Sequence, residues 1–173
     1  MEDSTSREKV LKRIRNALIS KGEIPYPEID IDSSVYPESD EPLAIQFAQA
    51  LNKCSGKFIY CESESEFINK LESLKREFQW KNIFASDPLL TNIFNQAEFD
   101  YLSSEERLME ADATVTECEF LVVRIGSVMV SSAMPSGRKA SVFPESHIVF
   151  AYTSQLVADI KDGLAGMRKK YED

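Results

Sequence analysis

The stretch that decides the fold is "FLVVRIGSVMVSSAMPSGRKASVFPESHIVF", residues 120–150. Two β-rich halves flank Ile125-Gly126, and this arrangement predicts an antiparallel hairpin, since glycine suits a tight turn. A second apolar run, "HIVFAY", begins at His147 and predicts another buried strand. Between hairpin and strand lies a polar loop rich in serine, with Gly137 near its middle. The rest of the chain determines what kind of sheet these strands join.

Upstream of this stretch, helical and strand patterns alternate along the chain. Helices of this length between strands indicate βαβ units and a parallel sheet. We therefore predict an α/β fold with a mostly parallel sheet plus the antiparallel hairpin. The predicted helices cover residues 42–54, 63–80 and 88–96, with a terminal helix capped near Thr153 or Ser154. The predicted strands cover residues 56–62 and 81–86, with a further candidate at 99–104.

Changes in composition along the chain predict three regions: an N-terminal helix over 1–22, an acidic proline-rich linker over 23–42, and an α/β domain over 43–173. Thr5 and Glu8 have the spacing of a capping box, and Gly22 supplies a stop. The basic residues of this helix form either a solvated face or a docking surface for an acidic partner. The linker holds four of the seven prolines and seven acidic residues, without Lys or Arg, which predicts an extended segment.

Composition limits the classes of function. The chain has 173 residues, 43% of them hydrophobic, and a formal net charge of −9. Phosphate backbones need clustered positive charge, so no nucleic-acid partner is expected. No apolar run is long enough to span a bilayer, and the charged N-terminus lacks the apolar core of a signal peptide. We expect a cytoplasmic protein that does not contact membranes.

The cysteines do not indicate a metal or cluster site. Cys54, Cys61 and Cys118 are odd in number and show no C-x-x-C spacing. A disulfide framework or an iron–sulfur motif has a different spacing. These cysteines fit small buried hydrophobic residues, so we expect no metal and no cofactor in this chain.

One candidate site is a serine hydrolase triad of Ser131 or Ser132, His147 and Glu145. A nucleophilic serine needs a general base within hydrogen-bond reach and a third group that orients the base. The chain has no G-x-S-x-G elbow, so the alternative is that the serines end one strand and His147 begins another. We favour this alternative and assign no catalytic residue.

The loop "SAMPSGRKAS", residues 132–141, is a candidate anion-binding site. Gly137 lets the backbone turn, and exposed N–H groups beside Arg138 can bind a carboxylate or phosphate. Ser131, Ser132 and Ser141 add hydroxyl donors. A polar turn with incidental charge fits the same residues, so both interpretations remain open.

Asp87 is a candidate of another kind, because it follows the predicted strand 81–86. Ligands of open α/β sheets bind beyond the carboxyl ends of the strands. Asp-Pro is equally a signal for the start of a helix, and that interpretation leads here. Asp112, Thr114 and Thr116, just before the apolar run, either line a site or cap a turn.

Several segments together resemble a known family. "ADATVTECEFLVVRIGSVMVSS", "GRKASVFPESHIVF" and "QLVADIKDGL" look like the LUD domain of the lactate-utilization protein C family. The opening "SREKVLKRIRNAL" is similar to that family's first helix. The likeness covers both ends and most of the middle of the chain, and the C-terminal block is the more specific part.

The resemblance implies a Rossmann-like three-layer sandwich similar to the NagB/RpiA/CoA-transferase group. It further implies an accessory or regulatory subunit in oxidation of L-lactate, or a similar small organic acid, to pyruvate beside iron–sulfur partner subunits. A small anionic ligand would bind at Asp87 and at residues of the hairpin loop and strand entry. The loop and strand residues are Ser131, Ser132, Gly137, Arg138, Ser141 and His147.

The chain departs from the family pattern at Arg124-Ile125-Gly126, where the family usually has Glu-Thr-Gly. A base in place of an acid inverts the local charge, so an acid/base role of that glutamate is lost here. The alternative function is a stand-alone enzyme similar to sugar-phosphate isomerases or CoA-transferases, with Asp87, Asp112 or Glu145 as its acid or base. Such an enzyme needs a carboxyl with a raised pKa pointing into a pocket.

Overall fold

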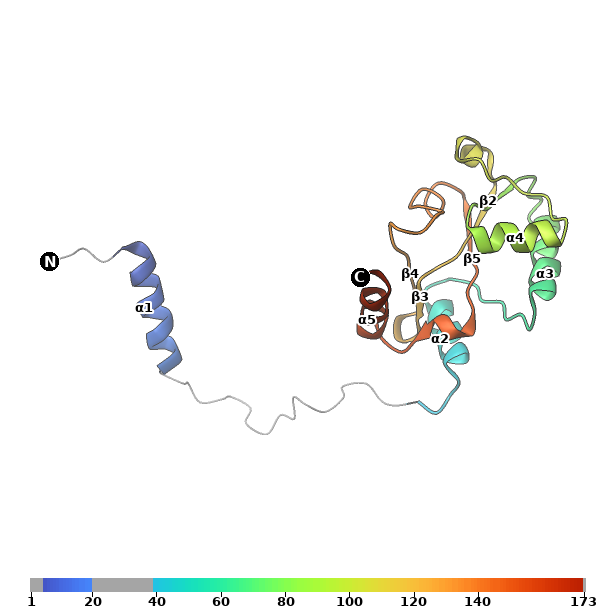
Figure 1. The fold of residues 1–173 in the computed structure, drawn as a ribbon. Coiled ribbons are helices and arrows are strands. Elements are labelled where there is room, and N and C mark those ends of the chain that lie inside the picture. Colours follow the sequence, from blue (N-terminus) through green and yellow to red (C-terminus); the bar gives the residue numbers. More distant parts are fainter. Residues whose placement is uncertain (1–4, 20–38, 173) are drawn as a thin grey trace. The chain divides into compact units, whose positions relative to one another are not determined.

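The computed structural model describes residues 5–19 and 39–172, and its ribbon is shown in Figure 1. The chain divides into two units, residues 1–39 and 40–173, which are described separately. In the first unit, α1 (Ser6–Ile19) begins with the predicted capping box. The Thr5 N–H donates to Glu8 at 2.9 Å, and the Glu8 N–H donates to Thr5 Oγ1 at 3.4 Å. Most of the predicted linker, residues 23–38, lies outside the described residues.

In the second unit, three predicted helices form with the expected signals. Ser63 caps α3 by accepting the Glu66 N–H at 3.1 Å, and α4 begins with Pro88, whose fixed φ suits a first helical turn. Each helix turns apolar residues inward, for example Phe47 of α2 and Leu71 of α3. The bounds are Leu43–Lys53 for α2, Glu64–Glu77 for α3 and Pro88–Gln96 for α4.

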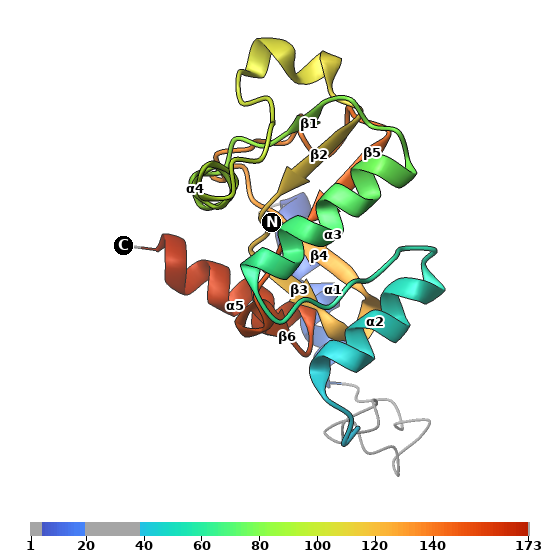
Figure 2. The same cartoon turned by 90° about the vertical axis from the view of Figure 1, so that its right-hand side faces the viewer.

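The first sheet is wholly parallel, with the strand order β1-β2-β5. Its strands are β1 (Ile83–Phe84), β2 (Ala113–Thr116) and β5 (Ser146–Val149). Helices α3 and α4 pack on one face, where Ile83, Ala113 and Val115 meet the apolar faces of both helices. Figure 2 shows α3 lying across this sheet. The opposite face packs against the 3₁₀ turn Glu105–Glu110 and the loop residue Ala140.

The second sheet contains the predicted hairpin and has the order β4-β3-β6. Strand β3 (Phe120–Val122) pairs antiparallel with β4 (Ser127–Met129) and parallel with β6 (Leu156–Val157). Helix α2 covers one face through Phe47. Helix α5 (Ile160–Tyr171) covers the other, where Gly163 and Gly166 let it approach Met129 and Phe120. This part of the molecule has three layers, and the α/β class with mostly parallel pairing plus a hairpin is confirmed.

The two sheets are joined by two chain segments that run side by side. Residues 117–119 carry the chain from β2 to β3, and residues 150–155 carry it from β5 to β6. The pairing continues briefly past the first sheet, because the Phe150 N–H donates to the Thr116 carbonyl at 2.9 Å. Beyond that point the strands separate before they pair again. This junction positions the candidate functional site.

Three sequence predictions of elements are wrong. Residues 56–62 form no strand, although Phe58 packs against the cluster around Phe47. Residues 99–104 contribute a single bridge between Leu102 and Phe84. The terminal helix starts at Ile160 with Asp159 as its cap, because Thr153–Gln155 is a 3₁₀ turn and β6 follows it. Short apolar runs do not reveal whether a neighbouring strand edge is free to pair.

Among residues 5–19 and 39–172, no helix combines the length and the apolar character needed to cross a membrane.

Candidate functional site

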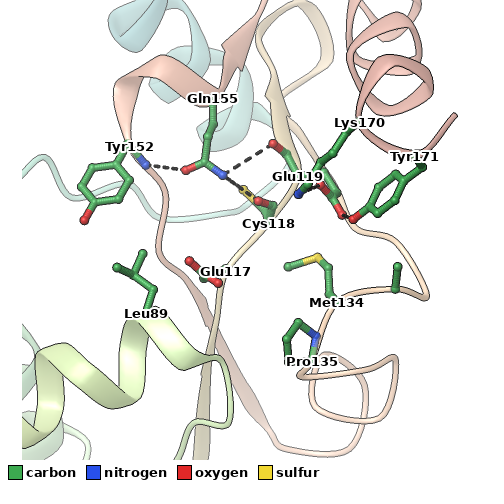
Figure 3. A pocket seen from close by; sticks show the side chains of 11 residues that line it. Leu89, Glu117, Cys118, Glu119, Met134, Pro135, Tyr152, Gln155, Lys170 and Tyr171 are labelled. Atoms are coloured by element: carbon green, nitrogen blue, oxygen red, sulfur yellow. Dashed lines mark hydrogen bonds and ion pairs between the residues drawn. The ribbon is translucent and has the colours of Figure 1, made fainter. Parts of the chain in front are cut away.

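A cavity of about 460 Å³ lies at the junction of the two sheets, where residues 117–119 separate from residues 150–155. It opens beyond the carboxyl ends of β1 and β2, the usual place for ligands of open α/β sheets. Figure 3 shows its side chains arranged around a common space. Its lining comes from the two junction segments, the loop after β4, and the ends of α4 and α5. These residues are Leu89, Glu117, Cys118, Glu119, Ala133, Met134, Pro135, Tyr152, Gln155, Lys170 and Tyr171.

Glu119 is the most heavily bonded group of the cavity, with only 2% of its side chain exposed. Its Oε1 accepts hydrogen bonds from Ser131 Oγ at 2.6 Å and from the Tyr171 hydroxyl at 2.5 Å. Its Oε2 pairs with Lys170 Nζ at 2.8 Å. Burial raises the pKa of Glu119, but the hydrogen bonds from Lys170, Ser131 and Tyr171 outweigh burial and lower the pKa overall. Glu119 is therefore an ionised anchor that ties α5 and the loop after β4 to the sheet.

Gln155 spans the gap between the two junction segments. Its Nε2 donates to the Cys118 carbonyl at 2.6 Å, and its Oε1 accepts the Tyr152 N–H at 2.7 Å. The amide thus replaces the ladder hydrogen bonds that the separated strands no longer make. Cys118 is buried beside it, and burial raises the pKa of its thiol to about 12. A thiol with this pKa remains protonated and is a poor nucleophile.

Glu117 differs from Glu119, because no hydrogen bond to the Glu117 carboxyl is seen among the described residues. Its backbone N–H is held by Asp87 Oδ2 at 3.0 Å, while its half-buried side chain points into the cavity (Figure 3). Burial and then the charge of Asp87 raise the pKa of Glu117, although Lys170 acts in the opposite direction. A carboxyl in this state keeps its proton to a higher pH than an ordinary glutamate does.

Asp87 sits at the carboxyl end of β1 and is fully buried. Its Oδ1 accepts the Ser136 N–H and its Oδ2 accepts the Glu117 N–H, both at 3.0 Å. The carboxylate therefore fixes the backbone on two sides of the cavity without lining it. The structure places this predicted site residue next to the cavity, in a supporting position.

Of the predicted hairpin-loop residues, Ser131 contacts the cavity lining, through its hydrogen bond to Glu119. Ser132, Gly137 and Arg138 are exposed and do not line the cavity. Ser141 donates to the Arg138 carbonyl at 3.0 Å and so closes the turn. The structure thus does not gather these loop residues around the cavity.

His147 lies on β5 and does not line the cavity either. Its Nε2 is 2.8 Å from Thr116 Oγ1, and desolvation lowers the pKa of the imidazole. No hydrogen bond joins the imidazole to Ser131 or Ser132 in the described part of the chain, so this geometry does not form a hydrolase triad. Asp112 does not line the cavity either. Its carboxylate accepts the Lys81 and Asn82 N–H groups just before β2 and so has a structural role.

Arg124, at the position where the resemblance to the LUD domain predicts an acid, has a structural contact. Its Nη2 pairs with Oδ1 of Asp159 at 2.6 Å, and Asp159 is the cap of α5. The ion pair lowers the pKa of Asp159. This ion pair therefore joins the hairpin turn to the start of the last helix, and Arg124 does not line the cavity.

The sequence patterns did not predict the principal residues of the cavity. These are Glu117, Glu119, Gln155, Lys170 and Tyr171. The available signal was "TECEF", residues 116–120, where two acids alternate with an apolar residue directly after a buried strand. Lys170 and Tyr171 carried no signal, because they read as the polar end of a terminal helix. Among the described residues, no three His, Cys, Asp or Glu side chains gather as ligands of a metal ion.

Comparison with known proteins gives one family model and one solved structure. The family model of the LUD domain matches residues 44–172. One solved structure is similar, a DUF162 family protein from Deinococcus radiodurans, with 19% sequence identity and a TM-score of 0.38. The match covers 65% of this chain and 84% of that protein. No curated protein matches. Since the family model spans well over half of the 173 residues, the chain belongs to the LUD domain family.

Proposed function

We propose that this protein is a cytoplasmic accessory subunit in the oxidation of L-lactate, or a similar small organic acid, to pyruvate. In this role it binds the acid in the cavity at the sheet junction and works beside partner subunits that carry iron–sulfur clusters. Membership of the LUD domain family supports the pathway. The observation that carries the binding role is the cavity of about 460 Å³, because its polar groups converge on a space of ligand size.

The chemistry of the lining suits a small organic acid. Lys170 offers an ammonium whose side chain is 59% exposed, with donors beyond the one that Glu119 uses. Glu117 offers a carboxyl without a hydrogen-bond partner among the described residues, able to meet a hydroxyl or a carboxylate. Leu89, Met134 and Pro135 supply an apolar wall for the carbon chain. A phosphate would bring two negative charges close to Glu117 and Glu119, which disfavours phosphorylated ligands.

Thermal unfolding in the presence of L-lactate, pyruvate, a sugar phosphate and coenzyme A tests the binding role. A ligand that binds the native state raises the melting temperature by mass action. We expect L-lactate or pyruvate to raise it, and stabilisation only by the sugar phosphate or coenzyme A would overturn the proposal. Lys170→Met should abolish the shift, and Arg138→Ala, which removes one cation outside the cavity, should preserve it.

Glu117 also supports a second candidate, a stand-alone enzyme that uses a carboxyl as acid or base. Its side chain meets the condition for that class, since it lines a cavity and its pKa is raised. The acid or base would then be Glu117, while Asp87 and Asp112 are engaged by backbone N–H groups. Turnover of a sugar phosphate or an acyl-coenzyme A by the purified chain, lost in Glu117→Gln, would favour this candidate over the subunit.

A further inference from the structure

The charges around the cavity affect how a negatively charged organic acid can bind there. Glu119 and Lys170 neutralise one another as an ion pair at 2.8 Å, so the local balance depends on Glu117. With Glu117 ionised, the cavity is negative, and an incoming carboxylate meets a like charge. With Glu117 protonated, its hydroxyl becomes a hydrogen-bond donor for that carboxylate.

Most of the charged groups around Glu117 favour its protonated form. Asp87, at the end of β1, places a buried carboxylate against the Glu117 backbone. Glu119, on the same junction segment, adds a second negative charge, and Lys170 of α5 adds the opposing positive charge. The Tyr152 hydroxyl is engaged by Glu64 of α3 at 2.6 Å, and its pKa is raised to about 12. Tyr152 and Cys118, whose pKa values are both raised to about 12, therefore stay neutral, and Glu117 is the carboxyl of the lining without a hydrogen-bond partner among the described residues.

We propose that Glu117 binds the ligand's carboxylate as a neutral acid, so that each anion enters this cavity together with one proton. Lys170 attracts the anion, and the protonated carboxyl of Glu117 donates to it. No covalent bond forms or breaks, and the proton comes from solvent. This inference rests on the proposed function, because it takes the ligand to be a small organic acid in this cavity.

The sign of the pH dependence follows from linkage. A bound anion favours the protonated form, so the pKa of Glu117 in the complex lies above its pKa in the free protein. Between these two pKa values, binding takes up one proton, and affinity falls up to about tenfold for each unit of rising pH. Below the free-protein pKa the affinity levels off. L-Lactate itself remains ionised above about pH 5, so its own titration does not interfere.

Titration calorimetry with L-lactate from about pH 5 to pH 8 tests the inference, with proton uptake measured in buffers of different ionisation enthalpy. We expect wild-type affinity to fall as pH rises, with close to one proton taken up. Glu117→Gln imitates the protonated carboxyl in shape and in its donors, so it should bind with little dependence on pH. Glu145→Gln makes the same change at an exposed position outside the cavity and should behave as wild type.

The possible results separate this inference from the proposed function. Binding of L-lactate without pH dependence, or equal pH dependence in wild type and Glu117→Gln, overturns the inference and leaves the proposed function standing. No binding of L-lactate or pyruvate at any pH overturns the proposed function, and the inference with it. The carboxyl of Glu117 makes no hydrogen bond to the described chain, so Glu117→Gln is expected to fold, and its thermal unfolding without ligand checks this.

Discussion

Asp87, Glu117 and Glu119 are three carboxyl groups at the sheet junction, and their hydrogen-bond partners determine their different roles. Asp87 accepts two backbone N–H groups and organises loops. Glu119 accepts hydrogen bonds from three side chains and stays ionised. Glu117 has neither kind of partner among the described residues, and its pKa is raised. The same chemical group thus serves as a clamp, an anchor and a proton-binding site within one junction.

The clamp leads to a prediction for Asp87→Ala. Removing the carboxylate leaves the part-buried N–H groups of Glu117 and Ser136 without an acceptor. We expect a loss of about 2–4 kcal/mol in the free energy of unfolding, measured by urea denaturation. Asp112→Ala is the matched control, since Asp112 also accepts two backbone N–H groups but is exposed. Water replaces that acceptor, and the expected loss is about 1 kcal/mol. Equal losses in the two variants would contradict the clamp role.

At the scale of elements, the hairpin turn is fitted against α2. Gly126 has φ +61°, and a Cβ there would lie 2.5 Å from the backbone nitrogen of Leu51 and 2.6 Å from the carbonyl carbon of Ala50. Both contacts are backbone atoms of a helix, which cannot move aside as a flexible side chain can. The glycine is required for the close approach as well as for the turn.

Gly126→Ala is therefore expected to cost about 2–5 kcal/mol in the free energy of unfolding, from left-handed strain plus overpacking. Gly137→Ala separates these two causes. Gly137 has nearly the same φ, +62°, but nothing lies within 4 Å of the position of an added Cβ. Its expected cost is about 1–2 kcal/mol, from conformation alone. Chemical denaturation of both variants measures the difference, and similar costs would show that α2 yields to the added methyl group.

The elements also show what the sequence can and cannot reveal. The hairpin at Ile125-Gly126, the Pro88 helix start and the Ser63 cap carry their signals in adjacent residues, and all three were predictable. The cavity was not, because it depends on where two strand pairs separate and on Lys170, which is 51 residues from its partner Glu119. Sequence patterns report burial and turns, whereas pairing between distant segments is decided by the packed molecule.

At the scale of the whole molecule, the two units have very different interiors. Residues 40–173 hold every buried side chain of the described core. Helix α1 buries none of its residues, and the apolar side chains of Val10, Leu11, Ile14 and Leu18 are 49–71% exposed. A helix of 14 residues without burial gains little stability from its own hydrogen bonds. Helix α1 therefore contributes little to the free energy of folding.

We accordingly predict that residues 40–173 fold by themselves. Deletion of residues 1–39 should change the free energy of unfolding by less than about 0.5 kcal/mol, because α1, the described helix of this unit, buries none of its residues. The urea m-value reports the surface exposed on unfolding, so it should also stay unchanged. Urea denaturation followed by circular dichroism measures both quantities in the full chain and in residues 40–173. A lower m-value in the shorter chain would show that the first unit buries surface in the native state, and the N-terminal helix would then be part of the fold.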